Sequence, residues 1–270
     1  MQMKSKEINR CICAETNSTV LFTAESYSVC SCISCGQVYV KGIDLNVIKD
    51  KYNEKDYFAE RNDYINRWEE FSYLFQKIVD KIIKFKPQGR LLDVGCSVGI
   101  FLDVALKNGF DVKGVEVSTW ASEFARQKGF DVMTGGLIEA AYPEKSFDVV
   151  VLNHVLEHLP KPVEILLEVK RILKDDGLLV IGVPNFGSYM ASIKKGKWAS
   201  LQPDQHIWQF THESLLRVLM KSGFSEVYFE AKENHRLNWM RPDSILFFMI
   251  NTFALLRNNA EAILFFARKS

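Results

Sequence analysis

The feature that most constrains the fold of this chain is an alternation of short apolar runs with amphipathic segments, which begins at Gly89. The apolar runs have the length of strands, and the segments between them carry apolar residues at helical spacing. The pattern predicts strands over 90–94, 111–116, 131–134, 147–152 and 178–183, and helices over 99–108, 119–128 and 162–173. Near-continuous runs such as FDVVVL and LLVIGV are typical of central strands covered on both faces. Alternating strands and helices predict a doubly wound, mostly parallel α/β sheet.

Segments on either side of this pattern complete a predicted organisation in three parts. A helix over 213–222 and strands over 225–231 and 262–267 bring the sheet to seven strands, in a domain at 88–270. Residues 1–42 form a Cys-rich, ribbon-like segment. Residues 43–87 form a helical cap or linker, in which apolar residues from Tyr64 to Ile83 recur at helical spacing. Pro87 cannot continue a helix, so we expect that helix to end just before it.

Charge balance and hydropathy exclude several classes of protein. The chain has 34 basic and 33 acidic side chains, so it offers no broad basic field and we expect no nucleic-acid partner. The first ten residues lack the apolar core of a secretory signal. The longest apolar stretch, 245–256, is shorter than the roughly 20 residues that span a bilayer. We therefore expect no transmembrane segment and a cytoplasmic location.

Two acids mark the carboxyl ends of the first two predicted strands. Asp93 is followed by a turn that contains Gly95 and Gly99 and passes directly into a helix. Small residues let the backbone approach a ligand closely, and the helix N-terminus presents N–H groups. Glu116 lies 23 positions after Asp93, close to the spacing of about 20 at which an acid binds ribose hydroxyls. The pattern predicts a nucleotide-like ligand at this edge of the sheet.

The turn lacks the G-x-G-x-x-G pattern of dinucleotide-binding oxidoreductases, which makes a nucleotide-dependent oxidoreductase the weaker alternative. It resembles instead the D-x-G-x-G-x-G loop of class I S-adenosylmethionine-dependent methyltransferases. The resemblance continues through SFDVVVLNHVLEHL at 146–159, which is similar to the fourth strand of that family, and RILKDDGLLV at 171–180, which leads into the fifth. Together these stretches cover roughly 89–184.

This resemblance implies a methyltransferase fold, S-adenosylmethionine as cofactor and a set of residues that bind it. Glu116 would bind the ribose, and Asn153 would lie beside the sulfonium. The other candidates for cofactor binding are Asp93, Gly95, Cys96, Ser97, Gly99, Val117 and Leu137. Two positions depart from the family pattern, since Ser97 replaces a common glycine and Gly136 stands in a stretch where many members carry an acid that contacts adenine. Leu137 would then pack against the adenine.

Two histidines are candidates for acid–base chemistry on a methyl acceptor. His158 follows the fourth predicted strand, and His206 lies in the connection where such enzymes build the acceptor pocket. Trp198, Trp208 and Phe210 would add aromatic walls to that pocket. A histidine suits proton removal from a hydroxyl or an acidic carbon at neutral pH. The alternative is that each imidazole bonds a backbone carbonyl and only fixes its loop.

Five of the six cysteines fall within the first 35 residues. Cys32 and Cys35, followed by Gly36, have the C-x-x-C-G form of a zinc knuckle, and Cys11 and Cys13 are the partner pair, although their C-x-C spacing is shorter than expected. Cys30 is a substitute ligand. The alternative is a ribbon that holds no metal and keeps its thiols as small apolar side chains.

An apolar segment near 244–256 also needs a partner surface. A helix that is apolar on nearly all sides is usually buried, either under its own domain or in a subunit contact such as a homodimer. The alternative is peripheral contact with a membrane that carries a lipid-linked acceptor.

These observations predict a methyltransferase that acts on oxygen or carbon of a small-molecule acceptor. Sugars, surface-polysaccharide precursors and lipid precursors are the candidate acceptors, because relatives with a similar ribbon and a similar H-x3-F-T stretch suggest them. A non-catalytic module that binds S-adenosylmethionine or recruits a partner is the alternative from another class.

Overall fold

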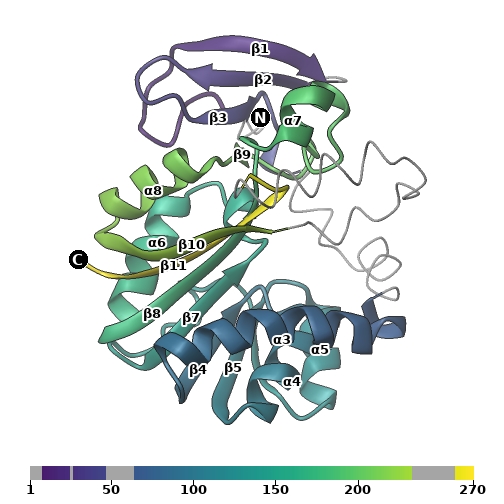
Figure 1. Ribbon diagram of the computed structural model, residues 1–270, viewed down its shortest axis with the longest axis vertical. Coiled ribbons are helices and arrows are strands. Elements are labelled where there is room, and N and C mark those ends of the chain that lie inside the picture. Colours follow the sequence, from purple (N-terminus) through teal and green to yellow (C-terminus); the bar gives the residue numbers. More distant parts are fainter. Residues whose placement is uncertain (1–7, 25–26, 47–63, 233–258) are drawn as a thin grey trace, which may run out of the picture.

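The structure is a computed structural model that describes residues 8–24, 27–46, 64–232 and 259–270. Within these residues the chain forms a seven-stranded sheet of order β10-β11-β8-β7-β4-β5-β6 and a four-stranded sheet of order β1-β2-β3-β9 (Figure 1). The strands of the large sheet are β4 (Gly89–Val94), β5 (Phe110–Glu116), β6 (Asp131–Thr134), β7 (Phe147–Asn153), β8 (Leu173–Pro184), β10 (Phe224–Lys232) and β11 (Ala262–Lys269). The strands of the small sheet are β1 (Ser18–Ala24), β2 (Tyr27–Cys32), β3 (Val38–Lys41) and β9 (Trp208–Gln209).

Helices cover both faces of the large sheet. They are α3 (Trp68–Phe85), α4 (Ile100–Lys107), α5 (Thr119–Gln127), α6 (Pro162–Ile172) and α8 (His212–Lys221), and the 3-10 turn η1 (Leu156–His158) follows β7. The short helix α7 (Tyr189–Lys194) and the 3-10 turn η2 (Lys195–Lys197) lie beside the small sheet instead. Five strands, from β6 to β8, run parallel, and β11 runs antiparallel to both β8 and β10. The predicted doubly wound, seven-stranded α/β fold is therefore confirmed.

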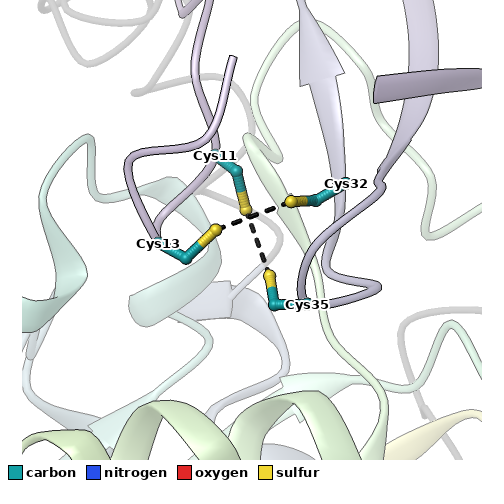
Figure 2. A group of neighbouring side chains, drawn as sticks. All are labelled: Cys11, Cys13, Cys32 and Cys35. Carbon is teal, nitrogen blue, oxygen red and sulfur yellow. Dashed lines mark hydrogen bonds between the residues drawn. The ribbon is translucent and has the colours of Figure 1, made fainter. Parts of the chain in front are cut away.

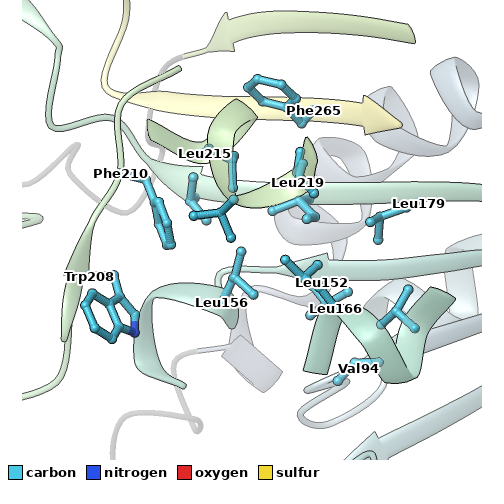
Figure 3. Packing of buried hydrophobic residues seen from close by; sticks show 14 of the residues in the cluster. Val94, Leu152, Leu156, Leu166, Leu179, Trp208, Phe210, Leu215, Leu219 and Phe265 are labelled. Carbon is cyan, nitrogen blue, oxygen red and sulfur yellow. The ribbon is translucent and has the colours of Figure 1, made fainter. Parts of the chain in front are cut away.

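The alternation of side chains along β7 shows how the two faces are buried. Val149 and Val151 pack with α3 and α4 on one face. Val150 and Leu152 pack with α6 and α8 on the other, in the core drawn in Figure 3. Successive side chains of a strand point to opposite faces, so the middle of a strand that is covered on both sides forms a near-continuous apolar run. The FDVVVL run is therefore a central strand, as predicted.

The amphipathic helix predicted before Pro87 is α3, whose last helical residue is Phe85. Its apolar face, which includes Ile78, Val79 and Ile82, packs against α4. Residues 64–66 are also helical, but Arg67 leaves the helical conformation with φ −110° and ψ 28°. The predicted single helix is therefore interrupted near its start.

The small sheet combines the N-terminal ribbon with β9, a short segment of the chain just before α8. Strand β3 pairs with β9, with Val38 opposite Gln209 and Tyr39 opposite Trp208. The Val40 N–H donates to the Ile207 carbonyl over 2.9 Å. We did not predict β9, because a two-residue strand has no periodicity and forms only when a partner strand is present.

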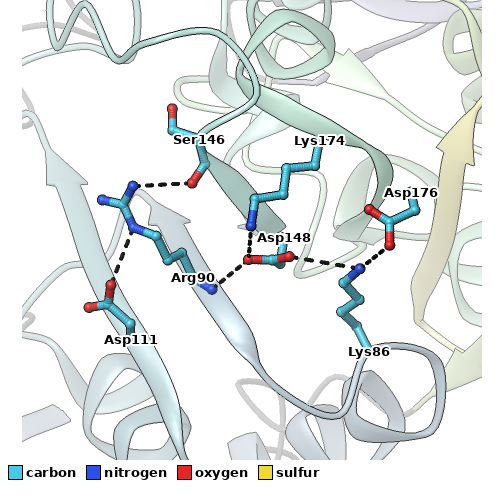
Figure 4. A network of polar contacts seen from close by, with 7 residues as sticks. All are labelled: Lys86, Arg90, Asp111, Ser146, Asp148, Lys174 and Asp176. Atoms are coloured by element: carbon cyan, nitrogen blue, oxygen red, sulfur yellow. Dashed lines mark hydrogen bonds and ion pairs between the residues drawn. The ribbon is translucent and has the colours of Figure 1, made fainter.

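A polar network joins the amino ends of β4, β7 and β8 (Figure 4). The Asp148 carboxylate accepts hydrogen bonds from the Arg90 backbone N–H and from Lys174 Nζ, both over 2.8 Å, and Lys86 Nζ lies 3.8 Å away. Although burial opposes it, bonding to Lys174 and Arg90 lowers the pKa of Asp148. Ligands of open α/β sheets bind at the carboxyl ends of the strands, so this network supports the fold from the opposite edge.

Within the part of the chain that the structure describes, no helix has the length and apolar character needed to cross a membrane. The apolar segment predicted at 244–256 lies outside the described residues.

Candidate functional site

Two buried acids lie at the carboxyl ends of neighbouring parallel strands. Asp93 in β4 is paired with Gly114 in β5, and Glu116 ends β5. Asp93 is 4% exposed and Glu116 is 3% exposed. Burial, together with the nearby Glu116 charge, raises the pKa of Asp93 well above its ordinary value. Such a pair is stabilised by a ligand that brings hydrogen-bond donors or positive charge to this edge.

The turn after β4 requires residues that tolerate positive φ. Gly95, Ser97 and Gly99 have φ of 76°, 52° and 91°. A Cβ on Gly95 would lie 2.5 Å from Val155 Cγ2, so this position also needs glycine for close packing against the segment after β7. Because three of the five consecutive residues from Gly95 to Gly99 have a left-handed conformation, the chain turns sharply into α4. The first N–H groups of α4 then face the strand ends.

Glu116 holds this turn in place. Its carboxylate accepts one hydrogen bond from the Ser97 backbone N–H over 2.9 Å and another from the Ser118 N–H over 2.8 Å. Ser118 in turn caps α5 by accepting from the Ala121 N–H. A carboxylate can accept about four hydrogen bonds, so these two do not by themselves exhaust it. Glu116 is thus placed to join the loop, the start of α5 and a hydroxyl-bearing ligand.

The remaining candidates for cofactor binding lie in different surroundings. The Cys96 thiol is buried in the core beside Gly114, so only the Cys96 backbone can face a ligand. Val117 is 55% exposed, whereas Leu137 is buried in the core on the α6 side of the sheet. Asn153 ends β7, and its buried Oδ1 has no hydrogen-bond partner among the described residues. A buried amide oxygen without a donor can accept a hydrogen bond from a water molecule or a ligand group.

The structure brings His158 and His206 together, although 48 positions separate them in the sequence. Their rings meet edge to face with centroids 4.6 Å apart. The Ile207 N–H donates to the Glu157 carbonyl over 2.9 Å, and Trp208 Nε1 donates to the Leu159 carbonyl over 2.8 Å. These bonds dock the β9 segment on η1, which follows the carboxyl end of β7.

Each imidazole also bonds a backbone carbonyl, as the loop-fixing alternative requires. His158 Nδ1 donates to the Gln205 carbonyl over 3.2 Å, and His206 Nδ1 donates to the Ser200 carbonyl over 2.8 Å. Because a carbonyl only accepts, Nδ1 must carry the proton in both rings. In a neutral imidazole the lone pair is then on Nε2. The two bonds therefore fix the loops and also set the tautomer of both rings.

Glu157 is a residue whose role the sequence analysis missed. Its side chain is 1% exposed, and neither carboxylate oxygen has a hydrogen-bond partner among the described residues. His154 Nδ1 lies 3.3 Å from Oε1, and His158 Nε2 lies 3.9 Å from it. The sequence contained a signal for this buried acid. Glu157 stands on a short turn between the apolar residues Leu156 and Leu159, whose burial would carry the acid into the interior.

The three aromatic residues predicted as walls of an acceptor pocket are packed in the interior instead. Trp208 and Phe210 belong to the core between η1 and α8 (Figure 3), and Trp198 packs in a smaller core beneath the ribbon. All three are at most 3% exposed. Their large apolar surfaces connect the ribbon to the domain, so that part of the expectation is corrected.

The four cysteines predicted as metal ligands converge on one point (Figure 2). The sulfur atoms of Cys11 and Cys35 lie 3.5 Å apart, as do those of Cys13 and Cys32, and all four lie within 4.8 Å of one another. A disulfide would bring two sulfurs to about 2.05 Å. Four thiolates around zinc, with Zn–S bonds of about 2.3 Å, lie roughly 3.8 Å apart. The observed spacing therefore fits a tetrahedral zinc site.

Two turns shape this cluster. The Ala14 N–H donates to the Cys11 carbonyl over 2.8 Å, and the Gly36 N–H donates to the Cys32 carbonyl over 2.9 Å. Both closing residues have positive φ, 74° at Ala14 and 69° at Gly36, so the C-x-C pair forms a turn like that of the C-x-x-C pair. The proposed substitute, Cys30, is buried in the core, and its thiol donates to the Ser28 carbonyl.

Comparison with known proteins assigns the family. A family model described as a methyltransferase domain matches residues 66–228, more than half of the chain. The chain belongs to the class I S-adenosylmethionine-dependent methyltransferases. This methyltransferase has the fold of an S-adenosylmethionine-dependent methyltransferase from Archaeoglobus fulgidus, with a TM-score of 0.61 and 24% identity over 80% of this chain and 100% of that one.

Two sequence relatives illustrate how far the methyltransferase resembles other proteins. An uncharacterised protein of Methanocaldococcus jannaschii is 24% identical over 177 residues, which cover 65% of this chain and 82% of that protein. A ubiquinone biosynthesis O-methyltransferase of Haemophilus ducreyi is 31% identical over 107 residues, which cover 36% of this chain and 45% of that enzyme. The matched part thus spans less than half of that enzyme.

The edge formed by Asp93, Glu116 and Asn153 fits the cofactor that this family uses. S-adenosylmethionine carries vicinal ribose hydroxyls, an amino group and a positive sulfonium, and these groups suit acceptors and negative charge. The site supplies a buried acid in each of two neighbouring strands and an amide oxygen without a donor among the described residues. The positive-φ turn between them lets the backbone approach a ligand closely.

Proposed function

We propose that this methyltransferase methylates a hydroxyl oxygen of a small acceptor, which binds beside the contact of His158 with His206, near the carboxyl end of β7. The observation that carries the proposal is the contact of His158 with His206, with centroids 4.6 Å apart. His158 follows Asn153 by five residues, so the pair adjoins the edge of the sheet that fits the cofactor. A site that holds two imidazoles with fixed tautomers is suited to activate a hydroxyl group.

The reaction is an in-line displacement in which an O–CH3 bond forms, an S–CH3 bond breaks and the hydroxyl proton is lost. When bound, S-adenosylmethionine supplies the methyl group on a positively charged sulfur. The protein must hold the acceptor oxygen in line with that methyl group, exclude water and assist removal of the proton. The Nε2 lone pairs of His158 and His206 are suited to this last task, because each can take up a proton or bind a cation.

Oxygen is favoured over carbon as the acceptor atom by one relative. The enzyme from Haemophilus ducreyi is named a ubiquinone biosynthesis O-methyltransferase, and it is 31% identical to this chain over 107 residues. Sugars, surface-polysaccharide precursors and lipid precursors are the acceptor classes that we would screen first, because they present several hydroxyl groups.

We further propose that Cys11, Cys13, Cys32 and Cys35 hold a structural zinc ion. The support is the convergence of four sulfur atoms within 4.8 Å on two closed turns. Zinc would fix the ribbon, and the ribbon contacts the acceptor side through the bond from Val40 to Ile207. The metal would therefore keep the His206 loop in position without taking part in the reaction.

The test is transfer of an isotope-labelled methyl group from S-adenosylmethionine to panels of sugar and lipid-precursor acceptors. Each acceptor is paired with its analogue that lacks the candidate hydroxyl. Label on oxygen, lost with the deoxy analogue and with Glu116→Ala, is the expected result. Label on carbon or nitrogen would overturn the choice of atom. S-adenosylmethionine binding without transfer to any acceptor would favour the non-catalytic binding module.

A further inference from the structure

We propose that Glu157, His158 and His206 form a second metal site, which binds a divalent cation through one carboxylate and two imidazoles. The ligand atoms of these three residues all lie within 4.8 Å of one another. First-row cations bind imidazole nitrogen and carboxylate oxygen at about 2.0–2.2 Å, which places neighbouring ligand atoms roughly 3–3.5 Å apart. Small side-chain movements would therefore close the three ligands around an ion.

The hydrogen bonds of the two imidazoles favour this assignment. Histidine ligands of metals usually donate the other ring N–H to a carbonyl or carboxylate, which orients the ring. His158 Nδ1 donates to the Gln205 carbonyl and His206 Nδ1 donates to the Ser200 carbonyl. Both rings therefore carry on Nε2 the lone pair that a metal requires.

Glu157 supplies the charge for which a cation would compensate. A carboxylate that is 1% exposed and accepts no hydrogen bond among the described residues is costly in its charged form. The His154 and His158 rings lie near Oε1, but at 3.3 and 3.9 Å neither of them forms a hydrogen bond with it that satisfies the usual geometry. A bound cation would neutralise Glu157 directly.

The backbone around the three ligands is held from two sides. The Ile207 N–H donates to the Glu157 carbonyl, and the Ile207 carbonyl accepts from the Val40 N–H of the ribbon. Glu157, Ile207 and Val40 are thus linked by consecutive backbone hydrogen bonds. A site needs such support, because its ligands must stay in place when the ion exchanges.

The donor atoms distinguish this site from the four cysteines. Two nitrogens and one oxygen suit zinc, iron(II) or manganese(II) with coordination positions left open, whereas four thiolates form a closed site. If the proposed O-methylation is correct, an open position would take the acceptor hydroxyl oxygen and lower the pKa of that hydroxyl. This role rests on the proposed function, whereas the binding of the ion does not.

The test uses cobalt(II) as an optical probe on the full chain, after removal of metal by a chelator. Thiolate ligands give cobalt an intense charge-transfer absorption, which nitrogen and oxygen ligands do not give. We expect two cobalt ions per chain, only one of them with thiolate absorption. Glu157→Gln and His206→Gln should each lower the affinity for the second cobalt ion at least tenfold and leave the thiolate absorption unchanged.

The matched controls come from a second His–Glu pair in the same chain. His212 Nε2 and Glu226 Oε2 lie 2.9 Å apart and do not belong to the cluster. Glu226→Gln and His212→Gln should leave both cobalt ions bound. Unchanged thiolate absorption in Glu157→Gln reports that the ribbon and its contacts are folded.

Two results would overturn the proposal. One is a single cobalt ion per chain, bound by thiolates only. The other is a second ion whose affinity is the same in Glu157→Gln as in the unaltered chain. Neither result depends on methyl transfer. A failure to find an acceptor would therefore count against the proposed function but not against the metal site.

Discussion

The Glu116 carboxylate accepts a hydrogen bond from the backbone N–H of Ser97 over 2.9 Å, although the two residues belong to different βα units. This bond fixes the turn after β4 against the end of β5. Ser97 holds φ of 52°, a conformation that is unfavourable for a residue with a side chain and that therefore needs such support. The turn that would face the cofactor is thus organised before any ligand binds.

Replacement of Glu116 by alanine should weaken S-adenosylmethionine binding by one to two orders of magnitude. The substitution removes the bond to Ser97 and the acceptor for ribose hydroxyls, and bonds to a charged group contribute about 1.5–3 kcal/mol. Calorimetric titration measures the change. Glu123→Ala, which removes an exposed glutamate of the following helix α5, is the control and should bind normally. Equal affinity in both variants would contradict the assigned role of Glu116.

Gly95→Ala should destabilise the protein and reduce cofactor binding. Its φ of 76° is unfavourable for alanine by about 1–2 kcal/mol, and the new Cβ would lie 2.5 Å from Val155. Gly109 has φ of 89° with no atom within 4 Å of a Cβ, so Gly109→Ala isolates the backbone cost. Thermal unfolding should show a larger loss for Gly95→Ala, and only that variant should lose cofactor affinity. Similar losses in both would disprove the packing argument.

Cys35→Ser should remove one equivalent of zinc and lower the melting temperature of the protein. The serine hydroxyl is a poor replacement for a thiolate, so tetrahedral coordination is lost. Cys30→Ala is the matched variant, because Cys30 is buried in the same ribbon outside the cluster. Elemental analysis after dialysis gives the zinc content. Zinc loss in Cys30→Ala equal to that in Cys35→Ser, or none bound by the unaltered chain, would argue against the site.

Asp148→Asn should make the free energy of unfolding less dependent on acid pH. Bonds from Lys174 and Arg90 lower the pKa of Asp148 in the folded chain, so its charge stabilises the fold above the unfolded pKa of about 3.9. This contribution disappears as the pH falls through the folded pKa. At pH 7 we expect a loss of about 1–3 kcal/mol. Denaturant titrations should show the two proteins converging toward low pH, and a constant difference would exclude this linkage.

The central sheet could be predicted because the residues of each strand carry, by themselves, the apolar pattern that indicates a strand. The FDVVVL run is apolar without interruption from Val149 to Leu152, as suits a strand covered on both faces, and Pro87 ends α3 regardless of its neighbours. The strand β8 begins at Leu173, five residues earlier than predicted, because Leu173 pairs with Phe147 across an irregular register. Such pairing depends on the partner strand and leaves no periodic trace in the sequence.

The acceptor side could be predicted only in part. His158 and His206 were recognisable as reactive residue types, but their contact depends on β9, a strand that exists only beside the ribbon. The aromatic residues Trp198 and Trp208 were placed in the correct region but assigned to a pocket. Their burial follows from the docking of the ribbon on the domain, and no spacing within either segment encodes that contact.

The account depends most on the identity of the ligand at the edge formed by Asp93 and Glu116. Calorimetric titration of the unaltered chain with S-adenosylmethionine, NAD and NADP tests it directly. We predict a dissociation constant in the micromolar range for S-adenosylmethionine and no measurable heat with either dinucleotide. Binding of a dinucleotide without binding of S-adenosylmethionine, or no binding of any of the three, would contradict the account.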